Sequence, residues 1–520
     1  MGGTRSDGAK ATTDDPQLFR NTTNDTQYFS ALHLFGISRS HAILFSLYLT
    51  MFLTALDITI VGTALPEITS QFEASAAQYT WVGSSYTLAS TSTTPLWAGA
   101  SDVFGRKPVL MAANLAFLVG STLAGSSTSI GMLIAGRTIQ CFGGGGLLIL
   151  NTIVIADLFE FKDRAKYYGF TGVIFAVSSA IVYINLPLEG ISLVVLTFFF
   201  KLKKSVRKPL QSLMGFDWLG GIGVLGGTIS FLLGLESGAS VQHSWKSAYT
   251  LGLVISGLVI LVLSFLWEWK CAKQPLIPIK VLVGRSNLAA LGTALGHSIV
   301  FISYDFYLPL YFQTVLHTSP IISGLYLLAL ILPLSIMSFV AGLYIRKTNK
   351  YCRASLLGSI LMTLGTGLFI SFGSTTNFPK IFLYQIIAGI GGGVLFLSPM
   401  MALQAHLSPE NIAAALSGFT FLRNLGTASS IVVGGVILQK GLGTNTLTTG
   451  HGGVIPTGIT KEKYTSALRI LLIFYTSICG VMLLASLLIA QKEADAQHVG
   501  QDNLEQVDME IFTGTKGEKA

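Results

Sequence analysis

Residues 130–157 read IGMLIAGRTIQCFGGGGLLILNTIVIAD and contain one basic residue, Arg137, and one acidic residue, Asp157. A helix needs about 20 apolar residues to cross the hydrocarbon core of a membrane, and this run is longer than that. Similar apolar runs occur along the whole chain, at residues 42–66, 79–99, 108–127, 167–200, 217–235, 247–269, 287–312, 322–345, 354–373, 378–404, 413–438 and 466–490. If 167–200 is counted as two short helices, the sequence predicts fourteen membrane-spanning helices.

The composition of the chain supports this interpretation. Of its 520 residues, 51% are hydrophobic and 11% are charged, against about 25% charged residues in soluble domains, and the mean hydropathy is +0.63. A soluble enzyme of this length could not cover its surface with so few charges, and the hydrophobicity excludes disorder for most of the chain. The four cysteines have no paired spacing, so we expect no disulfide framework, no metal site and no cofactor.

The basic residues indicate how the chain is oriented. Lys and Arg gather in alternate loops, for example at residues 162–166, 201–208 and 346–353, and cytosolic loops of membrane proteins carry such an excess. We therefore expect both termini in the cytosol, where residues 1–40 form a flexible tail and residues 491–520 an acidic tail. The net charge of +8 then reflects orientation in the membrane, and no nucleic-acid partner is expected.

A weak internal repeat divides the chain into two halves. Gly143–Leu147 reads GGGGL and Gly391–Leu395 reads GGGVL, and one basic loop pair, Arg106-Lys107, has a counterpart in Arg346-Lys347. Many secondary transporters are built from repeated halves with the substrate site between them, although Gly-rich helices also resemble one another without common origin. The predicted division is 41–208 for the N-terminal half, shortened at 167–200, then 209–280 for two inserted spans, and 281–490 for the C-terminal half.

Charged side chains inside the predicted spans are the first candidates for function. Asp57, Asp305, Arg137 and Arg423 lie within apolar runs, where charged groups are expensive and usually face a cavity or a partner. A buried carboxylate can also take up and release a proton. Arg137 precedes Gln140 by three residues, so both side chains lie on one helix face. The alternatives are a carboxylate satisfied by a hydroxyl group, and an arginine in a salt bridge that only packs helices.

Two further groups of polar and aromatic residues are candidates for a substrate cavity. Asp305 stands in YDFYLPLYFQ, residues 304–313, where Pro309 would open the helix and expose backbone carbonyls. Trp81 and Tyr86 lie at the entrance of another span. Either group could instead belong to the aromatic belt that anchors spans at the membrane interface. We expect the cavity to be lined by Trp81, Tyr86, Gln140, Asp305, Tyr307, Gln313, Arg423 and Asn424.

The segment after the second span, Gly99–Lys107, reads GASDVFGRK. A loop this tight needs Gly105, while Asp102 can cap the next helix or pair with a base. Arg106 and Lys107 face the cytosol in the predicted orientation. The spacing favours a loop with a role in gating over a basic anchor that merely fixes the orientation.

These motifs resemble those of the major facilitator superfamily, specifically its fourteen-span drug:proton antiporters. The segment LDITIVGTALP at 56–66 resembles the first-span motif of that family, with Gly62 where Asn is common. Residues 99–107 resemble the gating loop, with Ala98 at its leading Gly position, and RTIQ at 137–140 resembles the fourth-span motif. Residues 307–313 and 421–426 are also similar to fungal members. The resemblance implies an all-α polytopic membrane protein with two six-helix halves plus two inserted spans.

The same resemblance assigns roles to particular residues. Asp57 would couple transport to protons, with Arg137 tuning its charge state. Conformational change would depend on the gating loop, Gly99, Asp102, Gly105, Arg106 and Lys107. No nucleotide is implied, because the chain lacks a Gly-x-x-x-x-Gly-Lys-Ser/Thr motif.

The fifth span departs from the family pattern. The antiporter motif Gly-x-x-x-Gly-Pro-x-x-Gly-Gly is absent, and residues 169–180 run almost directly into YINLP at 183–187. About a helix's worth of chain is missing relative to the family. We therefore expect a short hairpin between 167 and 200, with its turn near 183–189.

The function that the sequence favours is proton-coupled export of small hydrophobic organic compounds, such as toxins, drugs or secondary metabolites. The expected partners are such a substrate, protons and the lipid bilayer, and the expected form is a monomer in the plasma membrane rather than the vacuole. One alternative is a siderophore or amino-acid transporter with the same fold. The other is a truncated, inactive transporter-like protein, which the missing antiporter motif favours.

Overall fold

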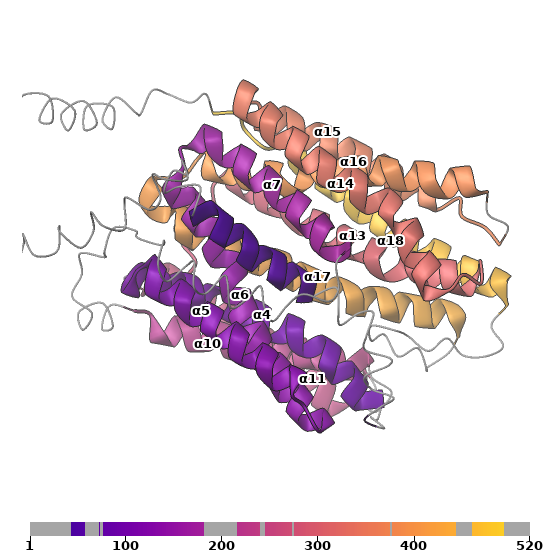
Figure 1. The fold of residues 1–520 in the computed structure, drawn as a ribbon, viewed down its shortest axis with the longest axis horizontal. Coiled ribbons are helices and arrows are strands. Elements are labelled where there is room, and N and C mark those ends of the chain that lie inside the picture. Colours follow the sequence, from indigo (N-terminus) through magenta and orange to yellow (C-terminus); the bar gives the residue numbers. More distant parts are fainter. Residues whose placement is uncertain are drawn as a thin grey trace, which may run out of the picture.

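The computed structural model describes residues 43–57, 72, 76–180, 216–239, 245–272, 275–374, 377–443 and 460–492, and its regular secondary structure within these ranges is helical (Figure 1). The first described helix is Ile43–Asp57. The others are α4 (Ala76–Phe104), α5 (Arg106–Gly125), α6 (Ile130–Leu158), α7 (Phe161–Ala180), α10 (Trp218–Ala239), α11 (Ala248–Lys270), α12 (Ile279–Leu282), α13 (Arg285–Thr314), α14 (Pro320–Thr348), α15 (Tyr351–Phe369), α16 (Phe378–Gln404), α17 (Ile412–Leu442) and α18 (Lys461–Leu487).

Each long helix coincides with one of the apolar runs of the sequence. Ten of the described helices are long and apolar enough to cross a membrane. The helices α4 and α7 are not among these ten, because serine and threonine residues interrupt α4 and charged residues occupy the start of α7. The prediction of an all-α polytopic membrane protein is therefore confirmed. The total of fourteen spans stays a prediction, because the second part of 167–200 lies outside the described residues.

The N-terminal group of helices is organised around α6. Both α4 and α5 pack along it. The first helix is held there by Asn151, whose Nδ2 donates to the Leu47 carbonyl oxygen at 3.1 Å and to Thr50 Oγ1 at 3.0 Å. A side-chain amide in an apolar span is satisfied in this way, and the contact fixes how far the first helix reaches along α6.

The C-terminal group repeats this arrangement around α16. Both α14 and α15 pack along α16, while α13, α17 and α18 pack against one another. A Cβ atom on Gly120 of α5 would lie 2.2 Å from the backbone nitrogen of Gln140, and one on Gly365 of α15 would lie 2.6 Å from that of Ala388. The missing side chains let the two backbones of each pair approach closely. The equivalent contacts in α5–α6 and α15–α16 support the internal repeat.

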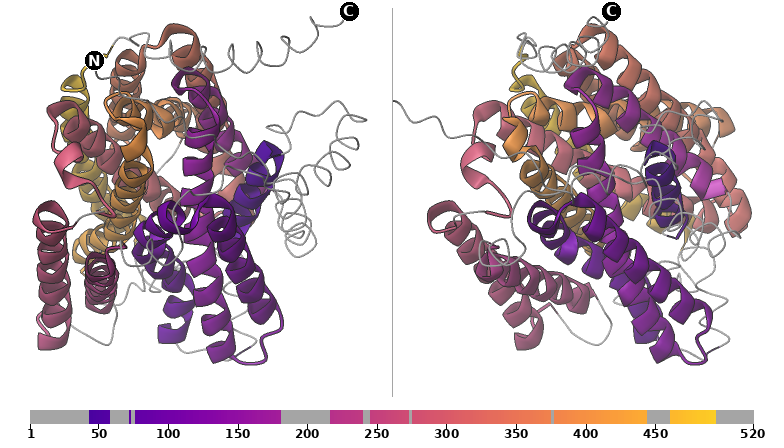
Figure 2. Two further views of the ribbon diagram at one scale, coloured as in Figure 1. Left: turned by 90° about the vertical axis from the view of Figure 1, so that its left-hand side faces the viewer. Right: turned by 60° about the vertical axis from the view of Figure 1, so that its left-hand side comes forward.

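The inserted helices α10 and α11 pack against each other beside the two groups (Figure 2). α10 also contacts α4 and α17, and thus one helix of each half. A Cβ atom on Gly99 of α4 would lie 2.2 Å from Leu276 Cδ2 and 3.1 Å from Phe216 Cε2. Gly99 therefore leaves room for the segments that flank the inserted pair.

The apolar core shows how the halves are joined. One cluster of buried residues combines both halves and includes Ile153, Ala165, Ala341 and Met401. It lies at the end of the bundle that carries Arg106 and Arg346, which we call the basic end. Away from the basic end, Val82 and Leu133 with their neighbours form a cluster in one half, and Tyr311, Phe369 and others form a cluster in the second. A smaller cluster of Leu232, Leu235 and Ala428 joins α10 to α17.

The two groups also diverge away from the basic end, toward the right of Figure 1. A bundle that is packed together at one end and separate at the other corresponds to one of the two states of an alternating-access mechanism.

Candidate functional site

A buried polar network joins the first helix to α6. Arg137 Nη1 donates to Asp57 Oδ1 at 2.6 Å and to Gln140 Oε1 at 2.8 Å. Gln140 Nε2 in turn donates to Asp57 Oδ1 at 2.9 Å and to Ser121 Oγ of α5 at 2.8 Å. Asp57, Arg137 and Gln140 are each 4% exposed. The structure thus brings together the aspartate and the arginine that the sequence singled out, and adds Ser121.

The position of Asp57 makes this network a candidate for proton transfer. It is the last described residue of its helix, and within the described part of the chain its Oδ2 and the Nε of Arg137 have no hydrogen-bond partner. An unpartnered oxygen on a buried carboxylate is a place where a proton can bind. Protonation would remove one charge of the pair and leave Arg137 with a weaker partner, so the network can report the protonation state of Asp57 to α6.

Gln140 belongs to this network. Its amide oxygen accepts from Arg137, and its amide nitrogen donates to Asp57 and Ser121. Its place in the lining of the substrate cavity stays a prediction. Tyr86 of α4 interacts electrostatically with Asp57 and Arg137, and its buried hydroxyl has no hydrogen-bond partner among the described residues. Trp81, five residues before Tyr86 on α4, is 40% exposed.

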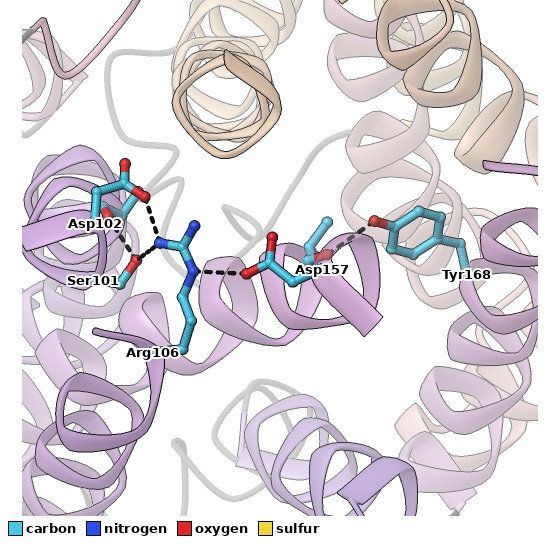
Figure 3. Close-up of polar contacts among 7 residues, drawn as sticks. Ser101, Asp102, Arg106, Asp157 and Tyr168 are labelled. Atoms are coloured by element: carbon cyan, nitrogen blue, oxygen red, sulfur yellow. Dashed lines mark hydrogen bonds and ion pairs between the residues drawn. The ribbon is translucent and has the colours of Figure 1, made fainter. Parts of the chain in front are cut away.

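The loop between α4 and α5 is organised around Arg106 (Figure 3). Gly105 has φ 91° and ψ 156°, a conformation that is open essentially to glycine alone, and it lets α5 begin directly after α4 ends. Arg106 Nη1 donates to Asp102 Oδ1 at 2.5 Å and to Ser101 Oγ at 2.6 Å, and its Nε donates to Asp157 Oδ2 at 2.8 Å. The loop is therefore tied to the end of α6.

Asp157 is the functional partner that sequence reasoning missed. The sequence alone gives it no role, whereas the structure makes it one of the two carboxylates that hold Arg106. Its position, 51 residues after Arg106, carries no local signal of that contact. Lys107, the other basic residue of the loop, is partly buried.

Two polar contacts cross between the halves at the basic end. Arg346 Nε of α14 donates to Asp163 Oδ1 of α7 at 2.6 Å, and Arg164 Nη1 of α7 donates to Gln404 Oε1 of α16 at 3.1 Å. The backbones of α7 and α14 also approach closely, because a Cβ atom on Gly342 would lie 2.4 Å from the Ala165 carbonyl oxygen. These contacts hold the bundle closed at this end.

The remaining cavity candidates belong to the C-terminal half and fall into two groups. Tyr307 is 5% exposed and donates its hydroxyl to the Ile431 carbonyl oxygen at 2.8 Å, so in this conformation it packs in the core. Gln313 Nε2 donates to Ser323 Oγ at 3.5 Å and links α13 to α14. Asp305, Arg423 and Asn424 remain partly exposed inside the bundle.

Comparison with known proteins assigns the family. The sequence profile of the Major Facilitator Superfamily matches residues 47–201 and 203–431 of this chain. The chain belongs to this superfamily. The chain is 37% identical over 495 residues to the efflux pump dotC of Dothistroma septosporum, covering 88% of this chain and 85% of that protein. It is 41% identical over 415 residues to the MFS-type transporter ppz2 of Metarhizium majus, covering 76% and 71% respectively.

Solved structures show the same fold. The human organic anion transporter MFSD10 has a TM-score of 0.57 at 14% identity, covering 87% of this chain and all of that one. The proton:xylose symporter XylE has a TM-score of 0.54 at 12% identity, covering 85% and 94%. At such low identity the likeness concerns the fold alone. The chain is therefore a transporter of the major facilitator type, embedded in a membrane by its apolar helices.

Proposed function

We propose that this transporter exports small, largely hydrophobic organic compounds in exchange for protons. The observation that carries the proposal is the buried Asp57–Arg137–Gln140 network between the first helix and α6, in which one carboxylate oxygen of Asp57 has no hydrogen-bond partner among the described residues. The relatives that are named efflux pumps support the direction of transport.

The mechanism follows from the two ends of the bundle. With the basic end in the cytosol, the conformation is closed to the cytosol by the packing of α7 against α14, to which the Asp163–Arg346 pair adds, and opens outward. Protonation of Asp57 in this state would weaken its bond to Arg137 and favour the change to the inward-facing state. A ligand can shift such an equilibrium only by binding the two states differently, so proton and substrate must prefer opposite states.

Sealed proteoliposomes with an imposed pH gradient would test the proposal. If the transporter exchanges substrate for protons, protons leaving an acidic lumen should drive a hydrophobic dye into the liposome. Cationic rhodamine 6G, a neutral coumarin and anionic fluorescein provide one probe of each charge. Accumulation that requires an alkaline lumen would contradict exchange and favour the uptake type of transporter. Sealed vesicles that accumulate no probe with either gradient would favour the inactive alternative.

A further inference from the structure

Arg423 is a charged residue in the middle of a membrane helix. It lies eleven residues after the start of α17 at Ile412, which is about 16 Å along the helix axis. A charged side chain at such a depth normally pairs with an opposite charge or lines a polar space. Its surroundings therefore decide what it does.

The surroundings of Arg423 are aromatic, not acidic. Its guanidinium carbon lies 4.7 Å from the ring centroid of Phe396 and 5.8 Å from that of Phe419. Among the described residues it makes no ion pair, and no carboxylate contributes to its electrostatic environment. Asp305, the other charged residue inside the C-terminal half, likewise has no electrostatic partner among the described residues. The positive charge of Arg423 is thus held by aromatic faces and not neutralised.

His297 packs against Phe396, one of the two rings that contact Arg423. It is fully buried, its Nε2 lies 3.1 Å from the Gly392 carbonyl oxygen, and its ring meets Phe396 edge-on at 6.2 Å. Because a carbonyl oxygen can only accept, Nε2 carries a proton and donates to it. The histidine therefore fixes the ring on which Arg423 rests and offers it no negative charge.

Phe396 and Arg423 are both only partly buried, so part of each side chain is accessible. Phe396 is the one position between Gly391 and Gln404 that is not fully buried. Leu148 occupies the corresponding place in the repeat and is likewise the one partly exposed residue between Gly143 and Asn151. α6 and α16 have the largest buried share of the candidate spans, so the two halves leave a side chain accessible at the same place on their most buried helix.

We propose that Arg423, together with Phe396 and Phe419, forms a subsite for the carboxylate of an aromatic organic acid. A guanidinium that stacks on rings keeps its edge N–H groups available, and these match a carboxylate in a bidentate pair. The phenylalanine rings offer faces and edges to an aromatic substrate. The inference deepens the proposed export function, on which it rests, by naming the class of compound.

Binding of a matched pair of probes tests the subsite. The probes are 2-naphthoate and its neutral counterpart 2-naphthamide, measured by calorimetry on the full chain in nanodiscs. Since a hydrogen bond between charged groups is stronger than one between neutral groups, we expect the wild type to bind naphthoate at least about tenfold more tightly. Arg423→Met should remove this preference and leave the affinity for naphthamide within about twofold. Arg423→Lys should keep part of it, because the point charge lacks the bidentate geometry.

A control and two contrary outcomes make the test decisive. Arg469 is exposed on α18, and Arg469→Met removes the same charge without changing the subsite, so it should keep the full preference. Equal wild-type affinity for the two probes would overturn the proposal even if Arg423→Met fails to fold. So would a preference that persists in Arg423→Met or is unchanged in Arg423→Lys. Arg423-dependent naphthoate binding without any transport would keep the subsite and refute the export function alone.

Discussion

At the scale of single residues, the pair formed by Asp57 and Arg137 is the most consequential contact of the N-terminal half. The two residues come from helices 80 residues apart in the chain, and both are almost fully buried. Removing one member of such a pair leaves an unpaired buried charge and typically costs about 3–5 kcal/mol. A substitution that keeps the hydrogen bond but not the titratable proton therefore separates coupling from stability.

Asp57→Asn is that substitution. The amide oxygen of Asn can still accept from Arg137 and Gln140, so we expect the variant to reach the membrane and to bind a probe. Because it cannot exchange a proton, accumulation driven by a pH gradient should fall to the background of protein-free liposomes. Asp57→Glu, which keeps the carboxyl group, is the control and should retain part of the coupling. Wild-type pH dependence in Asp57→Asn would show that another group carries the proton.

The loop glycine allows a second residue-scale prediction. Gly105 adopts φ 91° and ψ 156°, and a residue with a side chain held there costs about 1–3 kcal/mol. Gly105→Leu should therefore displace Arg106 from Asp157 and lower the transport rate while probe binding remains measurable, and Asp102→Ala should act in the same direction. Gly131→Ala is the control, because a Cβ atom there meets nothing within 4 Å. A normal transport rate in both loop variants would show that the loop fixes the orientation in the membrane and has no role in gating.

The candidate site was predictable from sequence where a charge contradicted its apolar surroundings. Asp57 and Arg137 stood out for that reason, and the spacing of Arg137 and Gln140 placed them on one face. The pairing of Arg106 with Asp157 depends on how three helices meet, and nothing local in the sequence encodes it. Tyr307 shows a distinction that the sequence does not make, because a polar aromatic residue in a span looks the same whether its hydroxyl meets a substrate or a backbone carbonyl.

At the scale of elements, α7 and α14 form the closed side of the bundle. Their glycines allow backbone contact, and Asp163 and Arg346 pair across them with side chains that are 42% and 46% exposed. An ion pair this exposed contributes about 0–1 kcal/mol, since water and salt screen it. The pair can therefore bias the equilibrium between the two states but cannot lock it.

We expect Asp163→Asn to shift the conformational equilibrium toward opening of the basic end by at most about fivefold. Distances between spin labels on α7 and α14 at this end would measure the shift. The charge-swapped double variant Asp163→Arg with Arg346→Asp should restore the wild-type distribution, because it rebuilds the pair in reverse. A shift that the double variant does not repair would place the effect on another contact.

The length of α7 shows how a local prediction fails. The sequence predicted a helix that begins near residue 167 and leaves about 15 residues for its crossing. The structure starts α7 at Phe161, because Lys162, Asp163 and Arg164 form its first turn at the basic end and do not belong to a loop. Its 20 residues give about 30 Å, which is enough to cross. A prediction based on apolar runs therefore places the start of this helix too late, because its first turn is charged.

At the scale of the whole molecule, the shared core at the basic end determines which end of the bundle is closed. Cysteine labelling can test directly whether that end faces the cytosol. Cys271 is exposed just after α11 at the basic end, whereas Cys141 and Cys479 are buried. In a Cys352→Ser background, a membrane-impermeant maleimide should label Cys271 only after cells are permeabilised. Ala248→Cys in a Cys271→Ser background, at the other end of α11, should react in intact cells. The reverse pattern would invert the orientation and with it the proposed open side.

The course of the chain after α7 yields the last prediction. α7 begins at the basic end, where Arg164 contacts Gln404, and its 20 residues carry Ala180 to the opposite side. Phe216, which precedes α10, is back at the basic end beside Gly99. We therefore predict that the chain between residues 180 and 216 crosses the membrane an odd number of times, and its length suits one crossing that returns before the basic cluster at 201–208.

Lys166→Cys and Lys201→Cys should consequently be labelled from the same side as Cys271, each in a background without other reactive cysteines. This outcome would place the predicted turn near 183–189 at the far side and give the N-terminal half an even number of spans. Labelling of the two positions from opposite sides would mean that no return crossing lies between residues 180 and 201. The basic cluster at 201–208 would then oppose the positive-inside rule. The return would also have to occur within residues 202–215, which are too few to span the hydrocarbon core as a helix.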